Sequence, residues 1–311
     1  MSGSRLPADR RPVLLTGIPR SGTTWVGRIL TVSRELGYIN EPFNRSVSPG
    51  SLRIPAESRY PYISEENEEQ FLPPFAELLA FQYPLARELR RCRNRTDLQH
   101  TVKSWRSFVD SRGRRPLVKE PHSIFSAAWF AGRLKSDVVV MVREPLAVVS
   151  SWKRLEWNVD FANLLDQPAL MRDWLGPFES EMRAALSPSW PLVDRVALFW
   201  RVVYSVAADE RFPEAVVLRH EDLSRDPVNG FRRLYDSLDM TFTARVVEAV
   251  RASSSSGNPA ETDVDDPHET RLDSEANLGN WRHRLEPHEV ARIRELTEQT
   301  AALYYSDISW E

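Results

Sequence analysis

The chain has 311 residues, of which 41% are hydrophobic and 27% are charged, and its formal net charge at pH 7 is −3. This composition is typical of a folded globular protein with enough apolar residues for a sizeable core. The small net charge excludes the strong positive field of a typical nucleic-acid-binding protein, so local cations must hold any anionic ligand.

A glycine-rich turn follows the first predicted strand. The apolar run at 13–15 ends at Thr16 and leads into Gly-Ile-Pro-Arg-Ser-Gly-Thr-Thr-Trp at 17–25, and the next residues to Leu30 have the apolar spacing of a helix. A turn between a strand and a helix aims backbone N–H groups and the positive end of the helix dipole at one anion. The pattern therefore predicts a phosphate-binding loop, although a plain connection between strand and helix would also fit it.

The loop lacks the lysine of an ATP-binding loop. The pattern G-x-x-x-x-G-K-[ST] would place that lysine where Thr23 stands, and the nearest cation here is Arg20. A kinase would also need a magnesium-binding carboxylate at a strand end, whereas Asp137 precedes its strand. A P-loop kinase is therefore a poor alternative.

Residues 19–25, Pro-Arg-Ser-Gly-Thr-Thr-Trp, resemble the P-K-S-G-T-T-W loop of the PAPS-dependent sulfotransferases, with arginine in place of lysine. PAPS is 3′-phosphoadenosine 5′-phosphosulfate. The resemblance implies that the loop binds the 5′-phosphate and that Trp25 stacks on the adenine. The residues implied in this binding are Arg20, Ser21, Gly22, Thr23, Thr24 and Trp25.

A second element of that family binds the 3′-phosphate through an arginine at a strand end and a serine eight residues later. Arg143 and Ser151 match it, because the apolar run at 137–142 predicts a buried strand and Pro145 suits the first turn of a helix. A guanidinium and a hydroxyl together suit a terminal phosphate monoester. Taken alone, Arg143 would fit a solvated strand end equally well.

Two later segments also resemble the family. Val-Val-Leu-Arg-His-Glu-Asp-Leu at 216–223 is similar to V-x-Y-E-D-L, with His220 in place of tyrosine, which implies packing near the adenine. A purely structural histidine is the alternative. Leu-Gly-Asn-Trp-Arg at 278–282 is similar to the terminal G-x-W-[KR] element and implies nucleotide-binding roles for Trp281 and Arg282. The basic R-K-G triplet that precedes this element in animal cytosolic members is missing.

Sulfuryl transfer needs stabilisation of the leaving phosphate and a base for the acceptor. Arg20 and Lys119 are the candidate cations, Lys119 because it lies in a K-x-P stretch similar to that of heparan-type members. A surface ion pair is the alternative for Lys119. Glu41 and His122 are the candidate bases. We prefer Glu41, because the K-x-x-H spacing is one residue longer than the K-x-H of phenol and steroid enzymes and would turn His122 to the opposite face of a strand.

Alternation of strands with helices predicts one three-layer α/β/α domain over 1–311 with a mostly parallel central sheet. The candidate core strands are 13–16, 117–119, 138–142 and 216–218, and a short strand precedes Glu41.

Two variable segments interrupt this pattern. The segment 44–84 is expected near the acceptor site, with a helix from Pro74, and 253–276 is predicted to be a surface loop or one that becomes ordered on ligand binding. The arginine-rich run at 87–95 suits a solvated helix face better than a guide for an anionic glycan. A helix at 287–303 closes the domain.

The single cysteine, Cys92, cannot form an internal disulfide, and the apolar run after the polar first eleven residues is too short for a signal peptide. We therefore expect a cytoplasmic protein without a membrane span. The predicted activity is transfer of a sulfuryl group from PAPS to a hydroxyl or amine of a small-molecule or carbohydrate acceptor, with no metal required. A non-catalytic phosphoadenosine-binding protein is the alternative of a different class.

Overall fold

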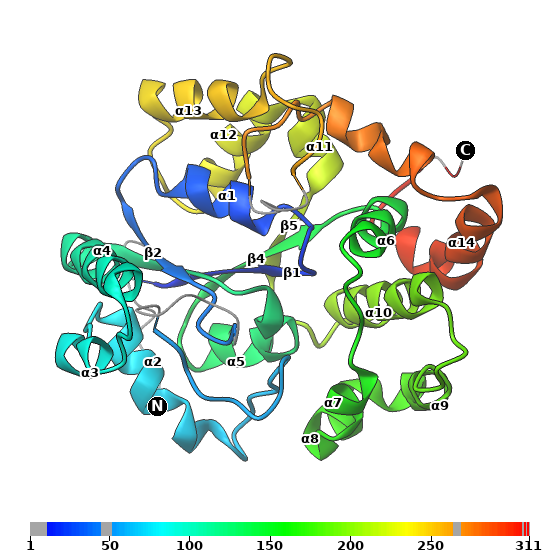
Figure 1. Ribbon diagram of the computed structural model, residues 1–311, viewed down its shortest axis with the longest axis horizontal. Coiled ribbons are helices and arrows are strands. Elements are labelled where there is room, and N and C mark those ends of the chain that lie inside the picture. Colours follow the sequence, from blue (N-terminus) through cyan, green and yellow to red (C-terminus); the bar gives the residue numbers. More distant parts are fainter. Residues whose placement is uncertain (1–10, 45–51, 264–268, 307, 309, 311) are drawn as a thin grey trace.

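A five-stranded parallel sheet lies at the centre of the computed structural model, which describes residues 11–44, 52–263, 269–306, 308 and 310 (Figure 1). The strand order is β2-β3-β1-β4-β5, and every neighbouring pair is parallel. The strands are β1 (Val13–Gly17), β2 (Leu36–Asn40), β3 (Arg115–Lys119), β4 (Asp137–Val142) and β5 (Ala215–Arg219). The predicted parallel sheet is confirmed.

Helices cover both faces of the sheet (Figure 1). On one face lie α1 (Thr23–Leu30), α11 (His220–Arg225), α12 (Pro227–Ser237) and α13 (Ala244–Ser254). On the other side lie α2 (Leu72–Leu79), α3 (Leu85–Leu89), α4 (Arg95–Ser111), α5 (Ala127–Gly132), α6 (Pro145–Arg154), α7 (Phe161–Leu165), α8 (Pro168–Leu170), α9 (Glu179–Ala184), α10 (Leu192–Ala207) and α14 (Pro287–Ala301).

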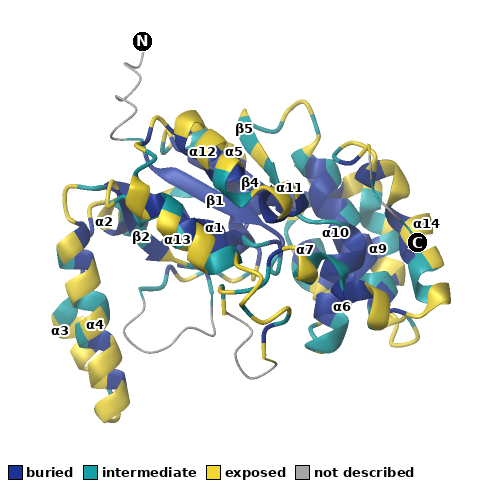
Figure 2. Ribbon diagram, turned by 90° about the horizontal axis from the view of Figure 1, so that it is seen from above, coloured by how far each residue is buried: buried dark blue, intermediate teal, exposed yellow. Residues whose placement is uncertain are grey.

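The central strands are buried on both faces, which explains their continuous apolar sequence. Alternate residues of β1 join different cores: Leu14 packs in the cluster with α5, α6 and α10, whereas Val13 and Leu15 pack in the cluster with α1, α12 and α13. Figure 2 shows these buried strands beneath helices whose outer faces are exposed. This double burial fixes the sheet, so the loops at its carboxyl edge start from rigid supports.

The predicted helix boundaries differ slightly from the observed ones. The helix expected from Pro74 begins at Leu72, because proline is accommodated in the first turn. The last helix ends at Ala301 rather than at 303. Part of 44–84 and, in the loop at 253–276, residues 264–268 lie outside the described residues. The prediction of one domain over 1–311 stays a prediction.

The arginine-rich run at 87–95 covers the end of α3, the turn that follows it and the first residue of α4, at one end of the molecule (Figure 2). The side chains of Arg87 and Arg91 are 61% and 56% exposed, and both pair with the buried carboxylate of Glu88. The arginines of the run are exposed, as expected for a solvated surface, but most of the run lies in the turn between two helices rather than on a helix face.

Candidate active site

A cavity of about 680 Å³ opens at the carboxyl edge of the sheet. The loops after all five strands contribute lining residues, among them Thr23 after β1, Glu41 after β2, His122 after β3, Arg143 after β4 and His220 after β5. This edge is where open α/β sheets bind ligands. The topology therefore brings together most of the residues that the sequence singled out.

The glycine-rich turn brings its backbone close to the side chain of His220. Gly22 is the N-cap of α1 with φ 101°, and a Cβ there would stand 2.7 Å from His220 Nδ1, so only glycine fits. Thr23, Thr24 and Trp25 of the first helical turn line the cavity. Gly22 has no side chain to cap the helix, which leaves the first N–H groups for a ligand.

Arg20 connects the loop to α6. Its Nε donates to Ser151 Oγ at 3.1 Å, and its NH2 donates to Thr262 Oγ1 at 3.3 Å. Burial, and then the positive charges of Arg143 and other arginines, lower the pKa of Arg20 to about 10. It therefore stays positively charged at neutral pH, and an anionic ligand would relieve the repulsion.

Arg143 follows β4 and also faces the cavity. Its NH1 donates to the Arg20 carbonyl oxygen at 3.1 Å, and its NH2 donates to Asn277 Oδ1 at 2.8 Å. Burial lowers its pKa, partly offset by Glu221 and Glu144. The buried Nε has no hydrogen-bond partner among the described residues. The guanidinium is thus fixed in position and retains donor capacity.

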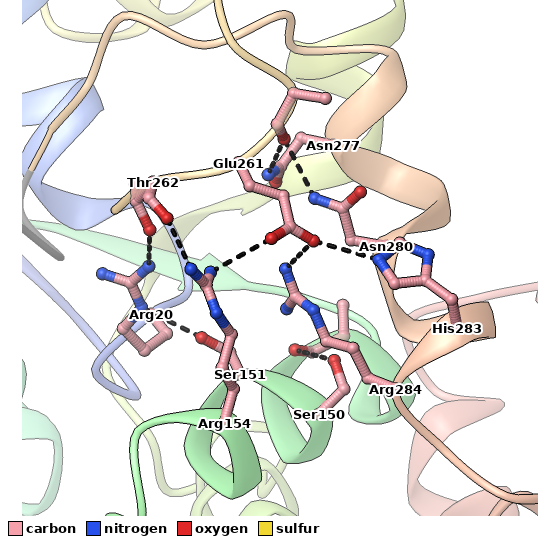
Figure 3. Close-up of polar contacts among 12 residues, drawn as sticks. Arg20, Ser150, Ser151, Arg154, Glu261, Thr262, Asn277, Asn280, His283 and Arg284 are labelled. Carbon is pink, nitrogen blue, oxygen red and sulfur yellow. Dashed lines mark hydrogen bonds and ion pairs between the residues drawn. The ribbon is translucent and has the colours of Figure 1, made fainter. Parts of the chain in front are cut away.

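Sequence reasoning missed a further pair of arginines in the cavity, Arg154 and Arg284 (Figure 3). Arg154 lies three residues after Ser151 on α6 and therefore on the same helix face, a signal that the sequence carried. The sequence around Arg284 has no comparable spacing from a residue that was already a candidate. Both contact Glu261: Arg154 NH1 lies 3.4 Å from Oε2 and Arg284 NH2 2.5 Å from Oε1.

The aromatic side of the cavity is formed by Trp25 and His220, whose rings meet edge-on at 6.0 Å. Trp25 Nε1 donates to Ser253 Oγ at 2.9 Å. Burial, reinforced by Arg143 and Arg20, lowers the pKa of His220 well below its ordinary value, so the ring is neutral. A neutral ring and an indole offer a flat, weakly polar wall rather than a catalytic group.

Trp281 and Arg282 lie outside the residues that line the cavity. Trp281 is buried in the core, and the exposed Arg282 guanidinium lies 4.5 Å from its ring centroid. In this part of the chain Asn277 and Arg284 line the cavity instead. The short 3₁₀ helix Ala276–His283 accounts for this, because it turns neighbouring side chains in different directions.

Lys119 and Glu41 form a buried ion pair, with side chains 2% and 12% exposed. Burial alone would raise the pKa of Glu41, but the charge and hydrogen bond of Lys119 and the hydrogen bond of Asn44 lower it below its ordinary value. Glu41 lines the cavity, whereas Lys119 is not among its lining residues. The Lys119 side chain is therefore connected to the cavity only through its ion pair with Glu41, as far as the described contacts show.

The expected orientation of His122 is wrong. β3 ends at Lys119 and a 3₁₀ helix runs from Pro121 to Ser126, so the alternation of a strand does not apply and His122 faces the cavity. His122 Nδ1 lies 2.8 Å from Glu120 Oε1, and its buried Nε2 has no hydrogen-bond partner among the described residues. Glu120 is a functional candidate that sequence reasoning missed.

Within the described part of the chain, no group of three or more His, Cys, Asp or Glu side chains could hold a metal ion. The described residues also contain no helix with the length and apolar character needed to span a bilayer.

A family model described as "Sulfotransferase domain" matches residues 10–304 of the chain. No curated protein matches this chain significantly.

Solved structures with a similar fold include mouse sulfotransferase SULT7A1 complexed with PAP, at 13% identity over 96% of this chain and 85% of that chain, with a TM-score of 0.45. The sulfotransferase domain of the Synechococcus PCC 7002 olefin synthase matches at 18% identity over 97% of this chain and 98% of that chain, with a TM-score of 0.47. Sulfotransferase STF9 from Mycobacterium avium matches at 15% identity over 97% of this chain and 78% of that chain, with a TM-score of 0.45. TM-scores below 0.5 assign no function to this chain.

Proposed function

The chain belongs to the sulfotransferase domain family and is a sulfotransferase, and on that premise we propose that it transfers the sulfuryl group of PAPS to a hydroxyl or amine of a small-molecule or carbohydrate acceptor. One observation carries the proposal. The glycine-rich loop, the pair Arg143 and Ser151, and the candidate base His122 all line the same cavity.

The cavity has suitable groups for a nucleotide with two separate phosphates. The loop 19–25 and the N-terminus of α1 would hold the 5′-phosphate. Arg143 and Ser151 would hold the 3′-phosphate, and Trp25 with His220 would form the wall for the adenine. The close approach of the Gly22 backbone to His220 and the unpartnered Arg143 Nε support this fit.

PAPS, when bound, supplies an activated sulfuryl group next to its 5′-phosphate. Arg20 and the N–H groups of α1 would stabilise the negative charge that develops on the leaving phosphate oxygen. Arg20 is suited to this electrostatic role because its pKa of about 10 keeps it charged at neutral pH. Lys119 would contribute through its ion pair with Glu41.

Both candidate bases line the cavity, and the contacts favour His122. Its Nε2 is unpartnered among the described residues, whereas Glu41 is held by Lys119 and Asn44 and has a lowered pKa. A carboxylate with a lowered pKa is a weaker proton acceptor. We therefore assign the proton-accepting role to His122 and an electrostatic role to Glu41.

The proposal is tested by two measurements on the purified chain. Calorimetry should give micromolar binding of 3′-phosphoadenosine 5′-phosphate (PAP) and much weaker binding of ADP and of ATP without magnesium. Incubation with PAPS and a panel of phenols, alcohols, amines and glycans should release PAP only when an acceptor is present. Equal or tighter ATP binding would contradict the proposal, and tight PAP binding without any transfer would indicate a non-catalytic binding protein.

The same assays distinguish the two bases. His122→Gln should lower turnover to a small residual rate and leave the affinity for PAP unchanged, because the ring is assigned to the acceptor side. Glu41→Gln should lower turnover less than His122→Gln. A Glu41→Gln variant with no turnover, beside an active His122→Gln variant, would reverse the assignment.

A further inference from the structure

Glu120 lies at the junction of the two loops that carry the candidate bases. It directly follows β3, is 0% exposed, and its carboxylate is the N-cap of the 3₁₀ helix that contains His122. Its Oε1 accepts from the His122 backbone N–H at 3.0 Å and lies 2.8 Å from His122 Nδ1. Its Oε2 accepts from the Phe43 backbone N–H at 2.7 Å.

We propose that Glu120 is a positioning residue that holds His122 in the tautomer protonated at Nδ1 and fixes the neighbouring loop of Glu41. This inference rests on the proposed function, because it gives Nε2 of His122 the role of proton acceptor. Glu120 itself is not a cavity-lining residue and acts through His122.

The hydrogen bonds dictate the tautomer. A carboxylate can only accept hydrogen bonds, so Nδ1 must donate to Glu120, and the neutral ring then has its lone pair at Nε2. The ring is also held by Tyr60, whose centroid lies 4.9 Å away. Nε2 is thus the one ring nitrogen able to accept a proton from a ligand in the cavity.

The buried carboxylate also stabilises the product of proton transfer. When the acceptor oxygen forms its bond to sulfur, its proton moves to Nε2, the sulfur–oxygen bond to the 5′-phosphate breaks, and that electron pair leaves with the phosphate. The imidazolium that results lies beside the Glu120 charge.

The second contact of Glu120, to the Phe43 backbone N–H, holds the turn that contains Glu41. In this turn Glu41 has φ 45°, and the Asn44 backbone N–H donates to the Glu41 carbonyl oxygen at 3.0 Å.

The charged and titratable groups near His122 come from several segments and all influence its pH dependence. Besides Glu120, they include Lys119 at the end of β3, Glu41 after the neighbouring strand β2, and Arg59 and Tyr60 from the segment over the ring. Replacing the Glu120 carboxylate by a neutral amide removes a charge at hydrogen-bond distance from the ring, so the pH profile of turnover should shift.

The first measurement is ¹⁵N NMR of the histidine side chains in the protein without nucleotide, with His122 assigned by its loss in His122→Gln. We expect the Nδ1–H tautomer in the wild type and a mixture of tautomers in Glu120→Gln. A wild-type His122 protonated at Nε2 and not at Nδ1 would overturn the inference, whether or not the chain transfers sulfuryl groups.

The second measurement is kinetic. Glu120→Gln should lower kcat at least tenfold, leave the affinity for PAP unchanged and shift the acidic limb of the pH profile to lower pH. In the His122→Gln background it should have no further effect on residual turnover. Glu120→Asp keeps the charge but withdraws it by one methylene, so its kcat should lie between those of the wild type and Glu120→Gln. This variant replaces Glu120→Gln in the assay if the latter does not fold. A folded Glu120→Gln variant with wild-type kcat and pH profile would overturn the inference, whereas a wild type without any transfer would contradict the proposed function instead.

Discussion

Arg20 Nε donates a hydrogen bond to Ser151 Oγ at 3.1 Å, across 131 residues of sequence. One residue belongs to the loop after β1 and the other to the helix after β4, and these strands are neighbours in the sheet. The two phosphate sites expected from separate motifs are therefore parts of one polar surface. Several consequences of this arrangement can be measured.

Arg143→Ala should weaken PAP binding about 10–100-fold, because a charged hydrogen bond to a phosphate contributes roughly 1.5–3 kcal/mol. Binding of ADP, which lacks the 3′-phosphate, should change little. Arg282→Ala is the matched control, since this arginine lies over the Trp281 ring and outside the cavity. Isothermal titration calorimetry measures all three effects. A larger loss of PAP affinity in Arg282→Ala than in Arg143→Ala would assign the 3′-phosphate site to Arg282 instead.

Glu261→Gln should tighten PAP binding about 5–30-fold, equivalent to roughly 1–2 kcal/mol. The Glu261 carboxylate contacts Arg154, His283 and Arg284, and since Arg154 and Arg284 line the cavity, an anion bound there would compete with Glu261 for their donors (Figure 3). Glu179→Gln, which changes an exposed carboxylate paired with Arg183, should leave the affinity unchanged. Weaker binding by Glu261→Gln would mean that this carboxylate orients the arginines for the ligand.

Lys119→Met should destabilise the fold by about 3–5 kcal/mol, because it leaves the largely buried Glu41 carboxylate without its cation. Combining it with Glu41→Gln should recover part of the loss. Urea unfolding of the two single variants and the double variant gives the coupling energy. A single-variant loss below about 0.5 kcal/mol, the range of ordinary surface substitutions, would contradict a tight ion pair.

Glu144→Gln should stabilise the protein more at pH 8 than at pH 5. Burial, and then the charge of Glu221, raise the pKa of Glu144 from 4.5 to about 7. At pH values between 4.5 and about 7, Glu144 keeps its proton in the folded state but has lost it in the unfolded state. The free energy of unfolding of the wild type therefore falls as the pH rises through this window. The advantage of the variant should grow by about 1–3 kcal/mol in urea unfolding. Equal advantages at both pH values would contradict the raised pKa.

The local elements of this site were predictable from sequence. The glycine turn at 17–25 and the arginine at the end of β4 are each specified within about ten residues, and the structure places both at the cavity. The orientation of His122 was predicted wrongly, because the prediction assumed that the strand continued past Lys119. Pro121 begins a 3₁₀ helix there, and one change of local geometry reversed the direction of the side chain.

The sequence by itself determined the strand–loop–helix units and the glycine turn, because apolar periodicity and glycine turns act between near neighbours in the chain. Its short motifs carried the resemblance to the family. Only the tertiary structure decided which cations share the cavity and which carboxylates hold them. Arg154 donates to the Thr262 carbonyl oxygen across 108 residues, and Glu120 accepts from Phe43 across 77. Such contacts depend on how the loops meet at the carboxyl edge of the sheet, and no local pattern encodes that meeting.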